Sequence, residues 1–330
     1  MKNKINSKKI SKKKRNILSD SPPINNLKEL IELSYSIKFY NNINMIVLWR
    51  ISPYLEELNK LIGMDNLKET IFAQILYYLQ GLHIRNASDE YLHTMIYGPP
   101  GCGKTTVAKI IGKIYQSLGI LSKHGKFRIA YRDDFIAGYL GQTSNKTQKL
   151  LKSCLGGVLF IDEIYSLAPK DSDRDSFSKE ALDTLTSFLS EHKNDFCCIG
   201  AGYEEEIENC FFSMNQGLKR RFPWIHKIEI YSSKNLTDIF FKMIYDMNWN
   251  CIVSHSEMIS FFDKYKLYFE NTGGDIETFI TKIKIEHAKR IINLSNDHKF
   301  ILNSEDINKA IKLIEKTKKL PTPPPMGLYI

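Results

Sequence analysis

The sequence predicts an α/β protein: a mainly parallel sheet with helices on both faces, followed by a small helical domain. Two observations support this prediction. Short β-type runs alternate with helical stretches through the middle of the chain. This strand pattern stops after Tyr231, where apolar residues recur only at helical spacing. The chain has 330 residues, 43% of them hydrophobic, which is enough for about two domains plus tails.

Five short apolar runs are the strand candidates. Helical stretches separate them, and this alternation is typical of a parallel sheet, because parallel neighbours need a long crossover that a helix can supply. The runs are Leu92–Tyr97, Phe127–Tyr131, Val158–Asp162, Phe196–Ala201 and Ile225–Ile230.

The pattern divides the chain into five parts. We expect a basic tail (1–23), an N-terminal segment (24–52), the α/β domain (53–230), the helical domain (231–318) and a Pro-rich tail (319–330). Within the second part, Ile43–Trp49 fits either a buried helix or a docking segment. The basic tail has too few apolar residues to offset the entropy of ordering, so we expect it to be disordered. The Pro-rich tail is expected to be extended.

The net charge of +9 is concentrated at the N-terminus. Residues 1–15 hold eight Lys or Arg and no acid, and without those eight the chain carries 38 basic and 37 acidic residues. Such a tail can bind nucleic acid or an anionic membrane surface, or act as a nuclear import signal through Lys12–Arg15. It is equally consistent with a solvated tail that has no partner.

Several patterns restrict the class of protein. No run approaches 18 apolar residues, and no apolar signal core follows the basic N-terminus, so we expect neither a membrane span nor secretion. The six cysteines form no CxxC pair, and the eight histidines lack ligand spacing. These patterns indicate a cytoplasmic or nuclear protein with reduced thiols and no metal site built by protein ligands alone.

A glycine-rich loop between the first strand candidate and a helical run is the strongest chemical signal. It matches G-x-x-x-x-G-K-[ST]. Its residues are Gly98, Pro99, Pro100, Gly101, Cys102, Gly103, Lys104 and Thr105, with Thr106 directly after. Such a loop turns backbone N–H groups toward phosphates at a helix N-terminus. We expect Lys104 to reach the β- and γ-phosphates of ATP, and Thr105 to bind Mg²⁺.

An acidic pair ends the third strand candidate. Asp162 and Glu163 follow the apolar run Val158–Ile161, and ligands of open α/β sheets bind at that end of the strands. We expect Asp162 to hold the Mg²⁺ shell and Glu163 to orient or deprotonate the attacking water. The pair therefore predicts ATP hydrolysis rather than nucleotide binding alone.

Longer strings around these motifs resemble the CbxX/CfxQ family of AAA+ ATPases, which includes red-type Rubisco activase and a sporulation ATPase. The resemblance runs from about Leu58 to Ile292. Its most specific strings are 156–167 (GGVLFIDEIYSL) and 179–185 (KEALDTL), and further matches are 61–64, 139–143 and 201–203. The resemblance implies an AAA+ fold with a helical lid, a homo-oligomeric ring (a hexamer), ATP with Mg²⁺, and a protein client.

Two sets of residues take their roles from this resemblance. Ile62 and Gly63, after Leu61, match the segment that packs on adenine. Gly217–Phe222 matches the stretch that carries the arginine finger, where Arg221 fits best and Arg220 is the alternative. An arginine inserted from a neighbouring subunit would stabilise charge on the γ-phosphate and make hydrolysis depend on assembly.

Tyr139, Leu140 and Gly141 resemble the aromatic–aliphatic–glycine pore loop of rings that thread polypeptides. An aromatic ring grips an extended chain mainly through apolar area, so it needs no particular client sequence. Gly141 permits the turn that presents the ring. The alternative is that Tyr139 and Leu140 are core residues in a strand–helix connection.

Three positions depart from common patterns. Tyr203 stands where many AAA+ proteins have an Asn that helps to place the water, as in the family that this chain resembles. Cys102 replaces a usual Thr and can make the site sensitive to thiol reagents. Gly273–Ile276 stands where the family has Gly-Asn-Ala-Arg, so the second-sensor Arg is missing. Four basic residues are candidates to replace it: Lys282, Lys284, Lys289 and Arg290.

Three functions fit the sequence. The leading hypothesis is an ATP-driven remodeller of protein complexes, which residues 139–141 indicate. The second is a nucleic-acid motor or loader, supported only by the basic tail, because the body has no recognisable nucleic-acid-binding module. The third is a nucleotide-gated scaffold with weak turnover, which the missing arginine favours. The sequence carries no signature of the client.

Overall fold

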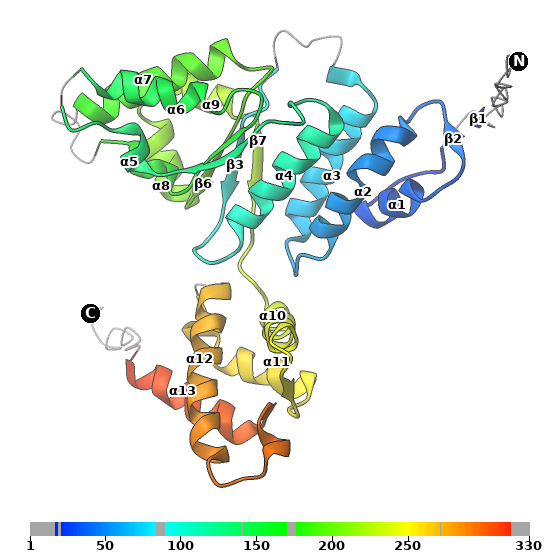
Figure 1. Ribbon diagram of the computed structural model, residues 1–330, viewed down its shortest axis with the longest axis vertical. Helices are drawn as coiled ribbons and strands as arrows, with labels where there is room; N and C mark the ends of the chain where they lie inside the picture. The colour runs from blue at the N-terminus through cyan, green and yellow to red at the C-terminus, as the bar shows by residue number, and fades with distance from the viewer. Residues whose placement is uncertain are drawn as a thin grey trace, which may run out of the picture.

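The computed structural model describes residues 17–18, 21–83, 90–139, 141–169, 176–270 and 272–317. Figure 1 shows an α/β domain with additional N-terminal helices, and a helical domain that follows the last strand of the sheet. Most of the basic tail, the Pro-rich tail and Leu140 lie outside the described residues, so the expectations for them stay predictions. No helix in the described part is long and apolar enough to cross a membrane.

A five-stranded parallel sheet forms the centre of the α/β domain and confirms the predicted fold. Its spatial order is β4-β5-β6-β3-β7, so the chain crosses from β3 to the far edge and then returns strand by strand. Each strand agrees with its predicted run to within three residues at either end. The strands are β3 (Thr94–Tyr97), β4 (Phe127–Ala130), β5 (Val158–Ile161), β6 (Cys197–Gly202) and β7 (Trp224–Lys227).

Helices cover both faces of this sheet because its side chains alternate between two apolar clusters. In β3, Ile96 belongs to one cluster while Met95 and Tyr97 belong to the other, the period expected of a strand buried on both faces. The first cluster is covered by α2 (Met45–Asn59), α3 (Asp65–Leu79) and α4 (Lys104–Leu118). The second is covered by α6 (Thr143–Lys152), α7 (Ser176–Glu191) and α9 (Gln216–Arg221).

Shorter elements complete the α/β domain and the segment before it. In the N-terminal segment, β1 and β2 pair with each other in parallel, apart from the main sheet. These elements are β1 (Ile17–Leu18), α1 (Leu27–Ser34), β2 (Phe39–Tyr40), α5 (Arg132–Phe135), the 3-10 turn η2 (Ile164–Leu167), α8 (Glu204–Glu206) and the π-helical turn η3 (Ile207–Phe212).

The N-terminal segment that the sequence left open, either a buried helix or a docking segment, contains helix α2. Leu48 is fully buried within it, while Trp49 on its outer face stays 66% exposed. The helix continues through Pro53, which lacks the N–H that would bond the Trp49 carbonyl. The Ser52 hydroxyl donates to that carbonyl instead, at 2.8 Å. The domain boundary expected between residues 52 and 53 falls inside this helix, so it is corrected: α2 packs on α4 as part of the α/β domain.

The second domain is helical. The structure differs from the sequence prediction in one feature, a short parallel pair of β8 (Asn250–Cys251) with β9 (Ile301–Leu302). The sequence did not predict this pair, because two residues are too few to show the alternation of a strand. The helices are α10 (Ser233–Asp246), α11 (His255–Lys264), α12 (Thr272–Ile291) and α13 (Ser304–Thr317), with the 3-10 turns η4 (Lys266–Tyr268) and η5 (Asn296–His298).

A buried charge network joins α12 to α13. The Asp306 side chain is 1% exposed and accepts hydrogen bonds from Arg290 at 2.8 and 3.0 Å. It also lies 3.0 Å from His287 Nδ1 and accepts from the Asn303 N–H at 3.1 Å. Burial alone would raise the pKa of this carboxyl, but the hydrogen bonds, first among them those of Arg290, outweigh burial and lower the pKa.

We expect Asp306→Asn to destabilise the helical domain by roughly 3–5 kcal/mol, because it leaves the Arg290 charge without its counter-ion. Since folding lowers the pKa of Asp306, the carboxylate contributes at neutral pH, and this contribution is lost as the pH falls through the lowered pKa. Urea unfolding and hydrogen exchange in α12 and α13 measure the effect. Glu305→Gln is the control, because this exposed side chain pairs with Lys309 in solvent. Equal effects of the two substitutions would contradict the explanation.

Candidate nucleotide site

Three parallel strands end level with one another at the edge where the predicted motifs lie. Tyr97 at the end of β3 pairs with Gly202 of β6, and Ile161 at the end of β5 pairs with Gly200. The Gly98 N–H also bonds the Gly202 carbonyl at 3.1 Å. The glycine-rich loop after β3 and the acidic pair after β5 therefore lie at the same edge, with one strand between them.

The glycine-rich loop turns directly into α4. Gly101 and Gly103 have φ angles of +68° and +93°, which a side chain would strain. A Cβ on Gly98 would lie 2.8 Å from Cys102 Sγ, so the turn is also tightly packed. Because α4 starts at Lys104, the loop ends at a helix N-terminus, the arrangement that binds phosphate.

Lys104 connects this loop to the acidic pair. Its side chain is 7% exposed, and Nζ donates to the carbonyls of Gly98 (3.1 Å) and Pro99 (3.0 Å). The same Nζ lies 4.0 Å from Glu163 Oε1 and 5.8 Å from the centre of the Tyr203 ring. A single buried cation thus stands between the phosphate-binding loop and the predicted catalytic carboxylate.

Glu163 has a backbone conformation that non-glycine residues seldom adopt, with φ at +49°. Its N–H bonds Asp162 Oδ1 at 3.1 Å, and its carbonyl accepts the Ser166 N–H at 2.7 Å, which starts the turn η2. Burial raises the pKa of the Glu163 carboxyl, the Lys104 ammonium opposes the rise, and Asp162 adds to it. A carboxylate with a raised pKa is better matched to taking a proton from water.

Thr105 and Asp162 offer oxygen donors to a divalent cation. Thr105 lies in the first turn of α4 and Asp162 directly follows β5, so both adjoin the phosphate-binding loop. Mg²⁺ bound with a nucleotide takes one or two such protein ligands, and phosphates and waters complete its octahedron. The two residues fit this pattern. Among the described residues no group of three His, Cys, Asp or Glu side chains is placed to hold a metal ion.

A cavity of about 410 Å³ between the two domains opens onto the loop. Apolar side chains from both domains line it, which fits a purine base beside a phosphate-binding loop. Gly63 is not among the lining residues, but its turn, with φ at +65°, leads to Met64 in the wall. Five of the predicted cofactor-binding residues line the cavity: Ile62, Gly101, Cys102, Gly103 and Thr106.

Sequence patterns did not predict the residues that the helical domain contributes to the wall of this cavity. Lys242 and Asp246 line the cavity from α10, and Glu277 lines it from α12. Tyr231, in the segment between the domains, also lines it, and its hydroxyl donates to the Cys102 carbonyl at 3.0 Å. The three charged residues occupy polar faces of amphipathic helices, where a binding residue has the same sequence signal as a solvated one.

The surroundings of Cys102 argue against the expected sensitivity of the site to thiol reagents. The residue is 2% exposed, and burial raises the pKa of its thiol although Lys104 opposes the rise. The thiolate is the form that reacts, so a buried thiol with a raised pKa reacts slowly.

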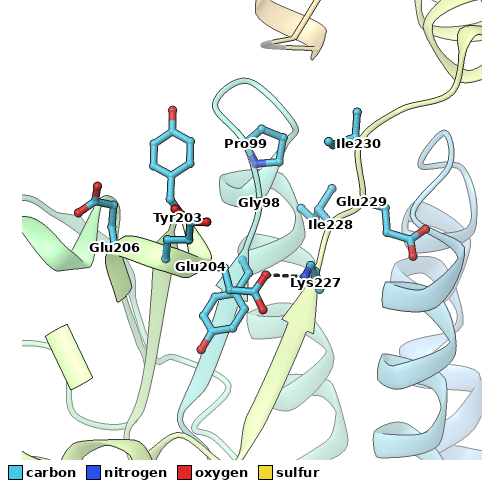
Figure 2. Close-up of a pocket in the computed structure, with 11 residues that line it drawn as sticks. Gly98, Pro99, Tyr203, Glu204, Glu206, Lys227, Ile228, Glu229 and Ile230 are labelled. Carbon is cyan, nitrogen blue, oxygen red and sulfur yellow. Dashed lines mark ion pairs between the residues drawn. The ribbon is translucent and has the colours of Figure 1, made fainter. Parts of the chain in front are cut away.

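A second cavity, of about 530 Å³, lies on another side of the loop (Figure 2). Tyr203 rises from the end of β6 beside Pro99, and Lys227 forms an ion pair with Glu204 at its floor. Four carboxylates and one lysine line this cavity, whereas two carboxylates and one lysine line the first. Because carboxylates repel a polyphosphate, the first cavity is the better nucleotide site. The remaining carboxylates of this lining are Glu205, Glu206 and Glu229.

The two arginines at the end of α9 differ in their surroundings. Arg221 is half-buried, and it donates to Ser190 Oγ and to the Gly217 carbonyl, both at 2.7 Å. Arg220 is exposed. Helix α9 leads into the beginning of β7, whereas the glycine-rich loop lies at the opposite, carboxyl edge of these parallel strands. The fold therefore brings neither arginine to the nucleotide site of its own chain.

Tyr139 is 74% exposed, so the alternative that made it a core residue is wrong. Gly141 has φ at +75° and open space around it. The stem of this loop is closed, because the Ala137 N–H donates to Thr143 Oγ1 at 3.2 Å. Glu180 of α7 accepts the Ser144 N–H at 3.1 Å and so caps the start of α6.

One arginine connects the loop segment to the turn behind Glu163. Arg132, the first residue of α5, donates to the Ser166 carbonyl in η2. Lys146 of α6 in turn donates to the carbonyls of Asp133 and Ile136, at 2.6 and 2.8 Å. Hydrogen bonds therefore run from the turn that carries Glu163, through α5, to both ends of the loop that carries Tyr139.

The parallel sheet, the loop with its lysine and the acidic pair define a P-loop ATPase with a helical lid. Residues 94–223 match the ATPase family associated with various cellular activities (AAA). A cfxQ-like protein of Acanthamoeba polyphaga mimivirus is 37% identical over 296 residues, 88% of this chain and 70% of that protein. The chloroplastic ribulose bisphosphate carboxylase/oxygenase activase of Cyanidioschyzon merolae is 32% identical over 238 residues, 68% of this chain and 76% of that protein.

Among solved structures, the Holliday junction branch migration motor RuvB of Thermotoga maritima covers 78% of this chain and 71% of its own, with a TM-score of 0.53 and 19% identity. That likeness shows the fold alone. The chain belongs to the CbxX/CfxQ family of AAA ATPases. It therefore binds nucleotide and hydrolyses ATP, and proteins of the AAA family generally form oligomers.

We expect Glu163→Gln to keep ATP binding and to lower turnover by roughly 10²–10⁴-fold, the usual contribution of a general base. Calorimetric titration with ATP and phosphate release measure the two effects. Lys104→Ala should lose binding itself. Glu205→Gln is the matched control, because this exposed carboxylate lines the second cavity beside the same loop. Equal turnover in the wild type and in Glu163→Gln would rule out the catalytic role.

Proposed function

We propose that this ATPase works as a homo-oligomeric ring, a hexamer, that uses hydrolysis to pull on polypeptide and so remodels protein complexes. The observation that supports the proposal is the exposed Tyr139 on a loop whose stem is hydrogen-bonded, through α5, to the turn that holds Glu163. An exposed aromatic ring offers apolar area to any extended chain, without reading its sequence.

The connection through Arg132 supplies a way for hydrolysis to act on that loop. Loss of the γ-phosphate changes the charge that faces Glu163 and Lys104. A shift of the Glu163 turn would displace the Ser166 carbonyl, to which Arg132 is bonded. Because Lys146 ties α6 to Asp133 within α5 and to Ile136 directly after it, the two helices that flank the loop would move together.

The position of α9 supports a ring. Arg220 and Arg221 lie where β7 begins, so either one reaches a γ-phosphate only on a neighbouring copy. Such a contact joins one edge of a subunit to the opposite edge of the next, and a head-to-tail contact of this kind forms a ring when its rotation closes, which we propose here. We assign the finger to Arg221, with Arg220 as the alternative.

Mg²⁺ is part of the proposed reaction. Thr105 and Asp162 would hold it, and its charge would neutralise the phosphate oxygens during transfer. The chain's own residues then divide the remaining work: Lys104 holds the phosphates, and Glu163 orients the water and accepts its proton.

One assay separates this function from the two alternatives. ATP turnover should rise with a permanently unfolded protein and stay constant with single-stranded DNA. Stimulation by DNA alone would favour a nucleic-acid motor that uses the basic tail, and slow turnover unchanged by either would favour a scaffold. We propose no particular client. A cytoplasmic or nuclear location is also proposed, from the thiols and from the basic run Lys12–Arg15.

We expect Arg221→Ala to bind ATP normally and to hydrolyse it about 10³–10⁵-fold more slowly, the usual effect of losing an arginine finger. Mixing it with Glu163→Gln subunits should restore part of the activity, since some interfaces then combine an intact arginine with an intact Glu163. Ser190→Ala controls for the structural role of Arg221, because it removes a partner and keeps the cation. Loss in Arg220→Ala and none in Arg221→Ala would make Arg220 the finger.

We expect Tyr139→Ala to leave ATP binding, assembly and melting temperature unchanged and to abolish stimulation by unfolded protein. The side chain is exposed, so its removal leaves no cavity, and it takes no part in phosphate or Mg²⁺ binding. Tyr245→Ala, which removes a tyrosine that is 79% exposed on α10, is the matched control. Normal stimulation of the Tyr139→Ala protein would refute the pore-loop assignment.

A further inference from the structure

A glutamate in the turn η3 joins the phosphate-binding loop to helix α9. One oxygen of Glu208 accepts a hydrogen bond from the Tyr97 hydroxyl at 2.8 Å, and the other accepts one from the Lys219 ammonium at 2.7 Å. Tyr97 is the last residue before the loop, and Lys219 directly precedes Arg220 and Arg221 in α9. A single side chain thus bridges the stem of the loop and the helix that carries both arginines.

The protonation of this bridge is well defined. Tyr97 is 3% exposed, and burial raises the pKa of its hydroxyl, as does the bond to Glu208, so the hydroxyl keeps its proton and donates it. The bond from Lys219 lowers the pKa of Glu208 although burial opposes it, and the bond from Tyr97 lowers the pKa further. Both donors therefore meet a carboxylate, the acceptor that makes the stronger kind of hydrogen bond.

The turn η3 also packs against the end of α9. The rings of Phe211 and Phe212 each lie with their centres 6.1 Å from that of Phe222, and all three side chains are buried. A close-packed contact of this kind transmits a displacement instead of absorbing it. The turn is π-helical, a rare form that often occurs at functional sites. A shift of η3 is therefore passed on to α9.

The other end of the bridge responds to phosphate. Lys104 Nζ donates to the carbonyls of Gly98 and Pro99, the two residues that follow Tyr97. An ammonium bonds more strongly to a phosphate oxygen than to a neutral carbonyl, so a bound nucleotide would draw Lys104 away from both carbonyls. The peptides directly after Tyr97 then change partners. Because the Tyr97 hydroxyl is bonded to Glu208, this change reaches η3.

We propose that Glu208 transmits nucleotide binding from the phosphate-binding loop to α9, so that the nucleotide of a subunit sets the position of the arginine which that subunit offers to its neighbour. Glu208 is a positioning residue here, because it acts on the reaction through α9. The role of the arginine rests on the proposed function. The coupling between the loop and α9 within one chain requires neither a ring nor a client.

A double-mutant cycle across the bridge tests this coupling in the full chain. Coupling is reciprocal, so breaking the bridge at α9 should change nucleotide affinity at the loop. Titration calorimetry should show ADP affinity lowered roughly fivefold or more in Lys219→Met and in Tyr97→Phe, the range of ordinary coupling between two sites. The double variant should show no further loss, because either substitution alone already breaks the bridge.

Hydrogen exchange gives a readout that a merely structural bridge would not change. In the wild type, ADP should slow exchange in residues 216–222 roughly fivefold or more, since binding orders the loop and, through it, α9. Glu208→Gln keeps one acceptor oxygen of the two, and should lose this response at saturating ADP. Glu204→Gln is the matched control, because it removes the nearby ion pair with Lys227 and leaves the bridge intact. Melting temperatures of the ligand-free proteins establish that the variants fold.

Additive losses of affinity in the double variant would overturn the proposal, and so would an equal response of α9 in Glu208→Gln and in the wild type. Protection of α9 that disappears on about tenfold dilution of the protein would also overturn it, because that protection would come from a subunit contact. Lys104→Ala should abolish ADP binding, which separates failure of the bridge from failure of the site. Failure of the remodelling function would leave these results unchanged.

Discussion

The nucleotide site depends on the parallel pairing of β6 with both of its neighbours. Strand β6 holds the loop after β3 and the acidic pair after β5 at one level, and its Gly202 carbonyl accepts the Gly98 N–H. The strand is tightly packed, since a Cβ at Gly200 would lie 2.7 Å from the end of the Ile164 side chain. A shift of one residue would turn every side chain to the opposite face. The 4.0 Å separation of Lys104 from Glu163 follows from this register.

Buried charged side chains have different roles in the two domains. In the helical domain, Asp306 has a full set of partners, so its network is complete and structural. In the α/β domain, Lys104 is 7% exposed, and its partners among the described residues are two neutral carbonyls, the Tyr203 ring at 5.8 Å and one carboxylate at 4.0 Å, itself 40% exposed. A buried ammonium with so little compensation gains from an anion. The incomplete partnership of Lys104 is thus what suits it to phosphate.

Local patterns predicted the strands, the loop and the acidic pair, because each is a contiguous string whose spacing follows from backbone geometry. They placed the start of the α/β domain at residue 53, inside α2, because the run Ile43–Trp49 fitted either a buried helix or a docking segment. The Ser52 hydroxyl that compensates for Pro53 has no sequence signature. Lys242, Asp246 and Glu277 were missed because they reach the cavity only once two domains meet. The difference between Gly273 and Gly274 likewise exists only in the folded chain, where one of two identical residues touches Gly101.

Two of the mechanical connections of the site start from different motifs. The turn behind Glu163 contacts Arg132 and so the loop with Tyr139, whereas the glycine-rich loop contacts Gly273 and Tyr231 of the lid side. In the proposed reaction Glu163 faces the γ-phosphate, whereas the glycine-rich loop binds the phosphates of ATP and ADP alike. Under the proposed function, phosphate release would therefore act first on the loop that carries Tyr139, and loss of ADP would act first on the contacts to Gly273 and Tyr231. Two motifs that share one edge of a sheet can in this way give two separate signals from one nucleotide.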